Sequence, residues 1–282
     1  MKHPLISIIT VCFNSEKNIK DTIESVLNQS YQNFEYIIID GGSIDRTLEI
    51  VKKYEPKFKG KLRWISEKDE GIYNAMNKGI NLAKGELIGI INSDDWYNSK
   101  ALEMIVNNYK KDIDIYHGDI YKFDKINNYM YIRRANGNKL DLIKNKMSIL
   151  HPSCFTSRSW YKKFKFDETY RIISDYKFIL ESFINGANFK YIHFPFSFVR
   201  SGGISSSQGN LGIKEGMYIR DEVLGKKFSS MKYIFKILIY KFHALIYNIL
   251  LISLPEMIFN KIKKIKGWGI YKYQDNKKNI FY

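Results

Sequence analysis

The chain has 282 residues, 45% of them hydrophobic, so it can bury the core of one large domain or two small ones, which excludes intrinsic disorder. Two cysteines are too few for a disulfide framework, which excludes the disulfide-stapled secreted class and fits a reducing compartment. The net charge of +16 is uneven, because residues 226–282 contain twelve lysines and two acidic residues.

The first hundred residues repeat one unit, an apolar strand followed by a polar turn and an amphipathic helix. The run Leu5–Phe13 is predicted to be a buried strand rather than a signal peptide, because it is short, Pro4 stands at its start and no small-residue cleavage site follows. The repeat predicts strands at Leu5–Phe13, Phe34–Ile39, Leu62–Ser66 and Leu87–Ile91, and helices at Glu16–Asn28, Thr47–Tyr54, Gly71–Ala83 and Lys100–Tyr109. Strands that alternate with helices at this spacing predict a parallel, doubly wound sheet.

After residue 110 the elements become less regular. The pattern predicts a strand at Asp112–His117, a hairpin over Tyr121–Arg134 with its turn at 125–128, an extended segment at Met147–Thr156, a helix at Ser174–Ile184, a strand at Asn188–Val199 broken at Pro195, and a loop at Ser201–Asn210.

The segment after residue 225 differs, because Met231–Leu254 has few polar breaks. Its uncharged core, Phe242–Leu254, has about thirteen residues, whereas a membrane-spanning helix needs about 20. Lysines flank this core and alternate with long aliphatic side chains, which favours an anionic membrane surface over nucleic acid. We therefore expect a helix in the membrane interface on the cytoplasmic side. The alternative is a helix pair that packs on the domain or on a second copy of the chain.

The run Leu87–Ile91 ends abruptly in the polar segment Asn92–Asp95. A short uncharged run is typical of a strand buried on both faces, and parallel sheets bind ligands just beyond the carboxyl ends of such strands. Two adjacent carboxylates, Asp94 and Asp95, repel each other unless a cation neutralises them, which indicates a divalent metal bridging to phosphate oxygens. The alternative is that one of them caps the helix predicted after Ser99.

Polar side chains also follow the other parallel strands, at the same edge of the predicted sheet. Asn14 follows the first strand, Asp40 the second, and Asp69 lies just beyond the third. An acidic rim of this kind repels a bare phosphate, but it suits a nucleotide diphosphate that arrives with a metal. Carboxylates that the metal does not need can bond a base N–H group or ribose hydroxyls.

Five segments carry a resemblance to a known family. Ser7–Asn14, Ile39–Thr47, Asp69–Gly79, Ala83–Gly85 and Asn92–Asp95 resemble the motifs of family 2 glycosyltransferases in order and spacing, and the resemblance extends over residues 5–205. It implies the GT-A fold, a Rossmann-like α/β architecture with a mostly parallel sheet flanked by helices, here followed by a basic helical extension. It also implies an inverting enzyme that uses nucleotide-diphosphate sugars with Mg²⁺ or Mn²⁺.

The resemblance implies roles for the rim residues that bind the nucleotide. Asp40 would bond the nucleobase, which is usually uracil in this family. Asn14, Asp69 and Lys78 would line the nucleotide pocket.

The resemblance also assigns the acidic metal motif to Asp94 and Asp95, one contacting the ribose or the sugar and one the metal. Many relatives have aspartate where this chain has Asn92, which can accept a hydrogen bond but supplies no charge. We therefore place the metal on these two aspartates, with Asp95 as the first choice.

An inverting transfer needs a general base on the acceptor hydroxyl. The family places an acid near the start of a late helix, and the match here is Asp175 in Ser174-Asp175-Tyr176. The N-terminus of the helix would lower the pKa of Asp175, whereas burial and nearby carboxylates would raise it. The alternative is that Ser174 or Asp175 caps the helix, and serine at 174, where relatives often have glutamate, leaves out a helper carboxylate.

Other polar and aromatic residues have candidate roles, and for three of them an alternative stays open. His151 would touch the acceptor or the sugar, or else bond backbone before the following proline. His117 and Asp119 lie at a predicted strand end where they could meet the donor sugar. Arg200 would close over the diphosphate or belong to a flexible loop. Trp96 could stack on a sugar face, with core packing as the alternative.

Taken together, the sequence predicts a GT-A domain over residues 1–225, with a nucleotide-binding half (1–98) and an acceptor-binding half (99–225), followed by a basic tail (226–282). The expected activity is metal-dependent transfer of a sugar, with UDP as the expected carrier, to a lipid-linked saccharide at the inner face of a bacterial membrane, for surface polysaccharide.

Two other functions fit the sequence less well. A sugar nucleotidyltransferase would need a glycine-rich, basic loop after the first strand, which Val11–Ser15 lacks. A non-catalytic sugar-binding or scaffold protein would not need the aspartates at 40, 94, 95 and 175.

Overall fold

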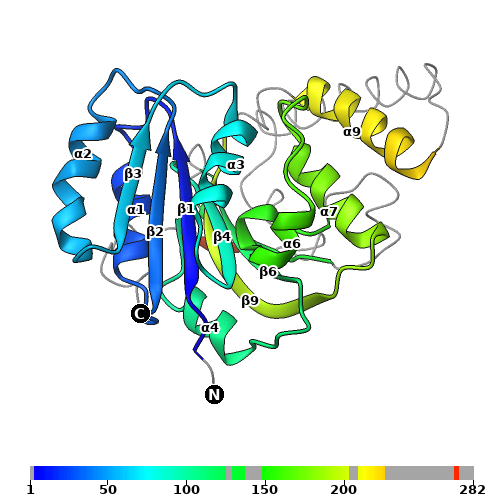
Figure 1. Ribbon diagram of the computed structural model, residues 1–282, viewed down its shortest axis with the longest axis horizontal. Helices are drawn as coiled ribbons and strands as arrows, with labels where there is room; N and C mark the ends of the chain where they lie inside the picture. Colours follow the sequence, from blue (N-terminus) through cyan, green and yellow to red (C-terminus); the bar gives the residue numbers. More distant parts are fainter. Residues whose placement is uncertain (1–2, 125–128, 137–147, 203–208, 226–269, 273–282) are drawn as a thin grey trace.

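The computed structural model describes residues 3–124, 129–136, 148–202, 209–225 and 270–272. In these residues a sheet of parallel and antiparallel strands is flanked by helices on both faces (Figure 1), which confirms the predicted α/β fold class. The predicted turn at 125–128, part of the predicted loop before Asn210 and nearly all of the predicted tail lie outside the described residues.

The described strands form one ten-stranded sheet, in which β10-β7-β6-β8-β4-β1-β2-β3 are neighbours in that order. The four strands predicted from the first hundred residues are parallel to one another, as expected: β1 (Ile6–Cys12), β2 (Phe34–Asp40), β3 (Leu62–Ser66) and β4 (Leu87–Asn92). Their register places Cys12 opposite Asp40 and Asp40 opposite Ser66, while Val11 lies opposite Asn92. The carboxyl ends of these strands therefore meet at one edge.

Alternating side chains of the parallel strands face two separate cores. Ile6 and Ile8 belong to one core, which is covered by α1 (Ile19–Leu27), α2 (Thr47–Tyr54) and α4 (Ala101–Asn107). Ile9 and Val11 belong to the other, which is covered by α3 (Ile72–Leu82), α6 (Arg158–Lys163) and α7 (Ser174–Ile184). Because both faces are covered, β1 and β4 are buried over nearly their whole length.

The second half of the chain continues the sheet with antiparallel strands. The predicted hairpin is present as β6 (Ile115–Asp124) and β7 (Tyr129–Arg133), and β8 (Phe155–Ser157) joins β6 to β4. The predicted extended segment before β8 is wrong in part, because η2 (His151–Ser153) forms a 3₁₀ turn there.

The strand predicted to break at Pro195 is continuous as β9 (Phe189–Arg200), which pairs with β6 and with the short β5 (Trp96–Tyr97). The register between β6 and β9 shifts on both sides of Asp119, whose partner is Pro195. The irregular pairing accommodates proline, which has no N–H group to donate to a ladder.

Five elements had no counterpart in the predictions: β5, η1 (Glu55–Phe58), α6, α9 (Gly209–Leu224) and β10 (Ile270–Lys272). Helix α9 begins within the segment predicted to be a loop, and it lies beside α7 (Figure 1). Strand β10 pairs with β7, so part of the predicted tail joins the edge of the sheet. Among the described helices, none is long and apolar enough to cross a membrane.

Candidate active site

The turn after β4 holds Asp94 and Asp95 in place. The Asp95 N–H group donates to the Asn92 carbonyl at 3.1 Å, and the hydroxyl of Thr22 in α1 donates to the Asp95 carbonyl at 2.6 Å. The next element is β5, and α4 starts later with Lys100 as its N-cap and no side-chain cap bond. The alternative that Asp94 or Asp95 caps this helix is therefore wrong.

Asp95 is 3% exposed, and its Oδ1 accepts a hydrogen bond from the Arg200 N–H group at 2.9 Å. Burial, and secondarily the charge of Asp94, raise the pKa of Asp95 to about 8. A buried carboxyl group of this kind holds its proton at neutral pH unless a cation arrives to pair with it.

Arg200, the last residue of β9, binds this turn. Its guanidinium donates to Asp21 in α1 at 2.5 Å and to the Asp94 carbonyl, and it lies 4.4 Å from the ring centre of Trp96. Trp96 is 8% exposed and stacks on Phe198, with ring centres 5.2 Å apart. This placement favours the alternative of core packing for Trp96, while contact of Arg200 with a diphosphate stays a prediction.

The turn offers donors that fit a magnesium or manganese ion. Asn92 Oδ1 is buried without a hydrogen-bond partner in the described structure, and Asp94 and Asp95 follow this residue in the same turn. No group of three or more histidine, cysteine, aspartate or glutamate side chains arranged for a metal occurs among the described residues. Mg²⁺ commonly takes one or two protein carboxylates and completes its shell with water and substrate phosphate. The donor set suits that mode of binding.

Asp40 is fully buried and fixes the loop after β2. Its carboxylate accepts hydrogen bonds from the N–H groups of Gly42 and Ser43 at 3.1 and 2.9 Å, and from the hydroxyl of Ser66 at 2.7 Å. Asn14 ties the end of β1 to the same loop, because its Oδ1 accepts from Ile44 N–H at 3.0 Å. Direct contact of Asp40 or Asn14 with a nucleotide stays a prediction.

Asp69 and Lys78 are brought together, as their predicted shared role requires. Lys78 Nζ lies 2.7 Å from Asp69 Oδ1 and 2.7 Å from Glu67 Oε1, and hydrogen bonds to these acids raise the pKa of Lys78. A Cβ atom on Gly41 would lie 3.1 Å from Asp69 Oδ2 and 3.5 Å from the ring of Phe13. Glycine at 41 therefore lets both side chains approach the loop.

Asp175, the predicted base, is partly buried at the start of α7. Its Oδ1 accepts from Tyr176 N–H at 2.9 Å, and the Tyr73 hydroxyl of α3 lies 3.3 Å away. Burial raises the pKa of Asp175 above its ordinary value, although His151 and these two donors act in the opposite direction. The competing expectations for this pKa are thus resolved in favour of burial.

Helix α7 has no side-chain cap at its N-cap position, although Asp175 accepts from the Tyr176 N–H group in its first turn. Ile173 is the N-cap and makes no side-chain cap bond, and Ser174 Oγ is buried without a partner in the described structure. Instead, the carboxylate of Glu215 in α9 accepts from the backbone N–H groups of residues 171, 172 and 173 at 2.8, 2.9 and 3.2 Å. The simple capping alternative for Ser174 is therefore wrong.

His151, His117 and Asp119 are enclosed, at 7%, 1% and 2% exposed. His151 packs edge-on against Phe166 and lies near enough to Asp175 for their charges to interact. Burial lowers the pKa of His117 to about 4, and Asp119 accepts from Ala135 N–H and from the Tyr191 hydroxyl, both at 2.9 Å. Sugar contact by these residues stays a prediction, and burial disfavours it.

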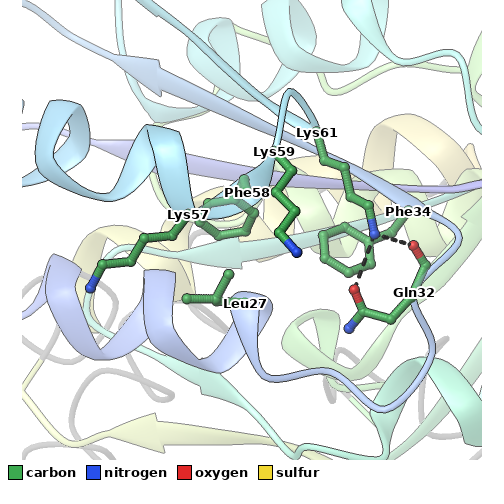
Figure 2. Close-up of a pocket in the computed structure, with 7 residues that line it drawn as sticks. All are labelled: Leu27, Gln32, Phe34, Lys57, Phe58, Lys59 and Lys61. Atoms are coloured by element: carbon green, nitrogen blue, oxygen red, sulfur yellow. Dashed lines mark hydrogen bonds between the residues drawn. The ribbon is translucent and has the colours of Figure 1, made fainter.

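The cavity in Figure 2 lies away from the acidic rim. Its volume is about 140 Å³, and its lining includes Phe34, which begins β2, whereas Asp40 ends that strand. The other lining residues are Leu27, Gln32, Lys57, Phe58, Lys59 and Lys61. With no acidic residue in its wall, it is a separate feature at the opposite end of the strand.

Three residues of this region were not among the site residues that the sequence predicted. Phe13 is 62% exposed beside the loop after β2, Tyr73 contacts Asp175, and Glu215 holds the segment before α7. Phe13 ends an apolar run, which predicted only burial. Glu215 belongs to a segment with glycines at 209, 212 and 216, so no helix was predicted there.

Known proteins resemble this chain in sequence and in fold. Residues 7–170 match the family model described as Glycosyl transferase family 2. An uncharacterised glycosyltransferase of Methanocaldococcus jannaschii is 31% identical over 202 residues, which cover 68% of this chain and 69% of that protein.

Two solved structures resemble the fold. S. aureus TarS 1-349 in complex with UDP has a TM-score of 0.59 at 19% identity, covering 81% of this chain and 68% of that one. The mannosyltransferase PcManGT of Pyrobaculum calidifontis in complex with GDP-Man and Mn²⁺ has a TM-score of 0.59 at 11% identity, covering 81% and 66%. These likenesses confirm the GT-A fold that the resemblance implied.

Proposed function

The chain belongs to glycosyl transferase family 2, and we propose that it transfers a sugar, with inversion, from a UDP-sugar to a hydroxyl group of a saccharide acceptor. The observation that carries the proposal is a division of acidic groups between two elements. Asp94 and Asp95 follow β4 at the rim, whereas Asp175 begins α7 with a raised pKa. The first pair suits a donor diphosphate, and the second position suits a base.

The donor side would be built from the rim. The exposed ring of Phe13 offers an apolar face for a nucleobase, next to Asp69 and the loop that Asp40 fixes. Asp94 and Asp95 would hold Mg²⁺ or Mn²⁺, which when bound supplies positive charge to the leaving diphosphate. The Asp69–Lys78 pair keeps a cation at the same edge.

The acceptor side would use Asp175. Its carboxylate takes the proton of the acceptor hydroxyl while that oxygen bonds to the anomeric carbon from the face opposite the diphosphate. The bond between the anomeric carbon and the diphosphate oxygen breaks in the same step, and its electron pair leaves with the nucleoside diphosphate. A base with a raised pKa accepts this proton more readily than an ordinary aspartate does.

We extend the proposal to a lipid-linked acceptor for surface polysaccharide, reached by peripheral contact of residues 226–282 with the inner face of the cell membrane. Its support is the charge of that segment, which holds twelve of the lysines in the sequence. We also retain the division into a catalytic domain at 1–225 and a basic tail as a proposal.

Replacement of Asp175 by asparagine tests the base. Asp175→Asn keeps the shape of the side chain and its acceptor oxygen but cannot take a proton, so we expect turnover to fall by at least about 100-fold. A panel of UDP-sugars and GDP-mannose would be assayed for nucleotide release, with water or added saccharides as acceptors. Binding of UDP, measured by calorimetry, should be unchanged in the variant.

The same calorimetry separates the alternatives. Binding of UDP should need Mn²⁺ or Mg²⁺ and should weaken in Asp95→Asn, which removes a charge from the proposed metal site. Wild-type turnover by Asp175→Asn would refute the assignment of the base. Failure of UDP to bind with either metal would instead favour a non-catalytic protein that retains the fold.

A further inference from the structure

The carboxylate of Glu215 binds three successive backbone N–H groups just before the proposed base. Glu215 is 7% exposed, and its Oε1 lies 2.8 Å from Arg171 N, while its Oε2 lies 2.9 and 3.2 Å from the nitrogens of Ile172 and Ile173. Hydrogen bonds from N–H groups to a carboxylate are among the stronger ones, especially away from water. The contact therefore fixes the backbone that leads into α7.

The same short segment is held from a second side. The hydroxyl oxygen of Tyr73 in α3 lies 2.7 Å from the carbonyl oxygen of Ile172 and 3.3 Å from Asp175 Oδ1. Tyr73 is 5% exposed and packs against Phe166, so its position is itself restricted. Ile172 is thus bound through its N–H group by α9 and through its carbonyl group by α3.

We propose that Glu215 is a positioning residue, which holds residues 171–173 so that Asp175 is presented in the geometry that proton transfer requires. The inference rests on the proposed role of Asp175 as the base. It gives one residue of α9 a positioning role in the reaction, although this helix lies beyond the residues that match the family model. Misplacement of a catalytic group by about 1 Å can cost about 100-fold in rate.

The chain offers a matched control on the same helix. Glu222 of α9 also binds across to the α7 side, because its carboxylate lies 2.6 Å from Lys177 Nζ and accepts from the Tyr170 hydroxyl at 2.8 Å. Lys177 keeps Asp167, at 2.6 Å, as a second partner. Loss of Glu222 therefore weakens the docking of α9 without touching the amides before Asp175.

The experiment compares Glu215→Ala, Glu215→Gln and Glu222→Gln in the full-length chain. We expect Glu215→Ala to lower kcat for UDP-sugar hydrolysis by about 10- to 100-fold, with the dissociation constant of UDP unchanged within about twofold. Glu215→Gln should retain an intermediate rate, because its one carbonyl oxygen can still accept from Ile172 and Ile173. Glu222→Gln should melt earlier than the wild type but keep its kcat.

Hydrogen exchange gives a readout that does not depend on activity. Peptides that contain the amides of residues 171–173 should exchange faster in Glu215→Ala than in the wild type, and at the wild-type rate in Glu222→Gln. Unchanged exchange in Glu215→Ala would show that Glu215 does not hold these amides.

Wild-type kcat in Glu215→Ala, or an equal loss of kcat in Glu222→Gln, would overturn the positioning role. Turnover by Asp175→Asn would instead show that the base is misassigned. The exchange experiment distinguishes this outcome from one in which Glu215 does not hold residues 171–173.

Discussion

Burial acts in the same direction on the two carboxyl groups that matter most to the proposed reaction. It raises the pKa of Asp95 to about 8, and it also raises the pKa of Asp175. The metal proposed at Asp95 would then bind in exchange for a proton. The proposed base Asp175 would be better matched to neutral pH than an exposed aspartate.

The link between Tyr73 and Asp175 predicts a shift in the pH dependence. The base must be ionised, so kcat should rise with pH through the pKa of Asp175. The hydrogen bond from Tyr73 stabilises the carboxylate and lowers this pKa, although burial outweighs it. In Tyr73→Phe the pKa should therefore rise, and the acid limb of the kcat profile should move to higher pH.

A suitable control for that profile is Tyr54→Phe. Tyr54 donates its hydroxyl proton to Glu24, between α2 and α1, far from Asp175 in the sequence and in the other core. The acid limb of the kcat profile of Tyr54→Phe should coincide with that of the wild type. An acid limb that stays in place or moves to lower pH in Tyr73→Phe would contradict the assignment.

At the scale of elements, α3 connects the two halves of the site. Asn77 donates to the Phe166 carbonyl at 2.9 Å and to Glu168 at 2.7 Å, while Lys78, one residue on, pairs with the rim acids. Gly79 then lets the helix approach β1. The segment Asp69–Gly79 resembles a family motif in the sequence. In the structure it contacts both the acidic rim and the segment that precedes Asp175.

Gly79→Ala should destabilise the protein. A Cβ atom at 79 would lie 2.5 Å from Cγ2 of Ile9, a fully buried side chain of β1. Overpacking of this kind costs about 1–3 kcal/mol, which exceeds the gain of up to about 1 kcal/mol from replacing a helical glycine by alanine. Urea unfolding should show the lower free energy of unfolding.

Gly212→Ala is the matched helical control. A Cβ atom there would lie 3.5 Å from Cγ2 of Ile172, an ordinary van der Waals contact. This variant should be neutral, or more stable by up to about 1 kcal/mol. If Gly79→Ala proved as stable as the wild type, the close approach of α3 to β1 would not require glycine.

At the scale of the whole molecule, charge is concentrated in one part of the chain. Residues 226–282 hold twelve lysines and two acids, a net +10 of the total +16. Clusters of lysine near a membrane attract anionic headgroups by about 1 kcal/mol for each charge. The proposed peripheral contact therefore predicts binding that depends on both lipid charge and salt.

We expect the full-length chain to sediment with vesicles of phosphatidylcholine and phosphatidylglycerol at low salt, and not with phosphatidylcholine alone. Replacing Lys261, Lys263 and Lys264 by glutamine should weaken this binding by about 100-fold, and added salt should release the wild type.

The control removes the same charge from the surface of α2 and η1, by glutamine at Lys53, Lys57 and Lys59, of which the last two line the cavity in Figure 2. Full binding by this control is expected. Equal weakening of both variants would mean that membrane binding follows net charge and not the tail.

Local patterns were sufficient for the parallel half of the sheet. The predicted bounds of Thr47–Tyr54, Leu62–Ser66 and Ser174–Ile184 match α2, β3 and α7, because apolar periodicity records which side of each element faces a core. The same patterns placed Asp40 and Asp94 at strand ends, and parallel pairing brings such ends to one edge.

Local patterns do not specify which distant segments meet, and this limited the prediction of polar partners. Arg200 pairs with Asp21 and Glu215 binds the amides before Asp175, across separations of 179 and about 43 residues. A polar side chain in the sequence carries no record of its partner, because a hydrogen bond depends on where the backbone of another element passes. Burial of Asp95, the contact of Glu215 with the segment before α7 and the packing of Trp96 were therefore settled by the folded chain, since each depends on how β9 and α9 return to the rim and to α7.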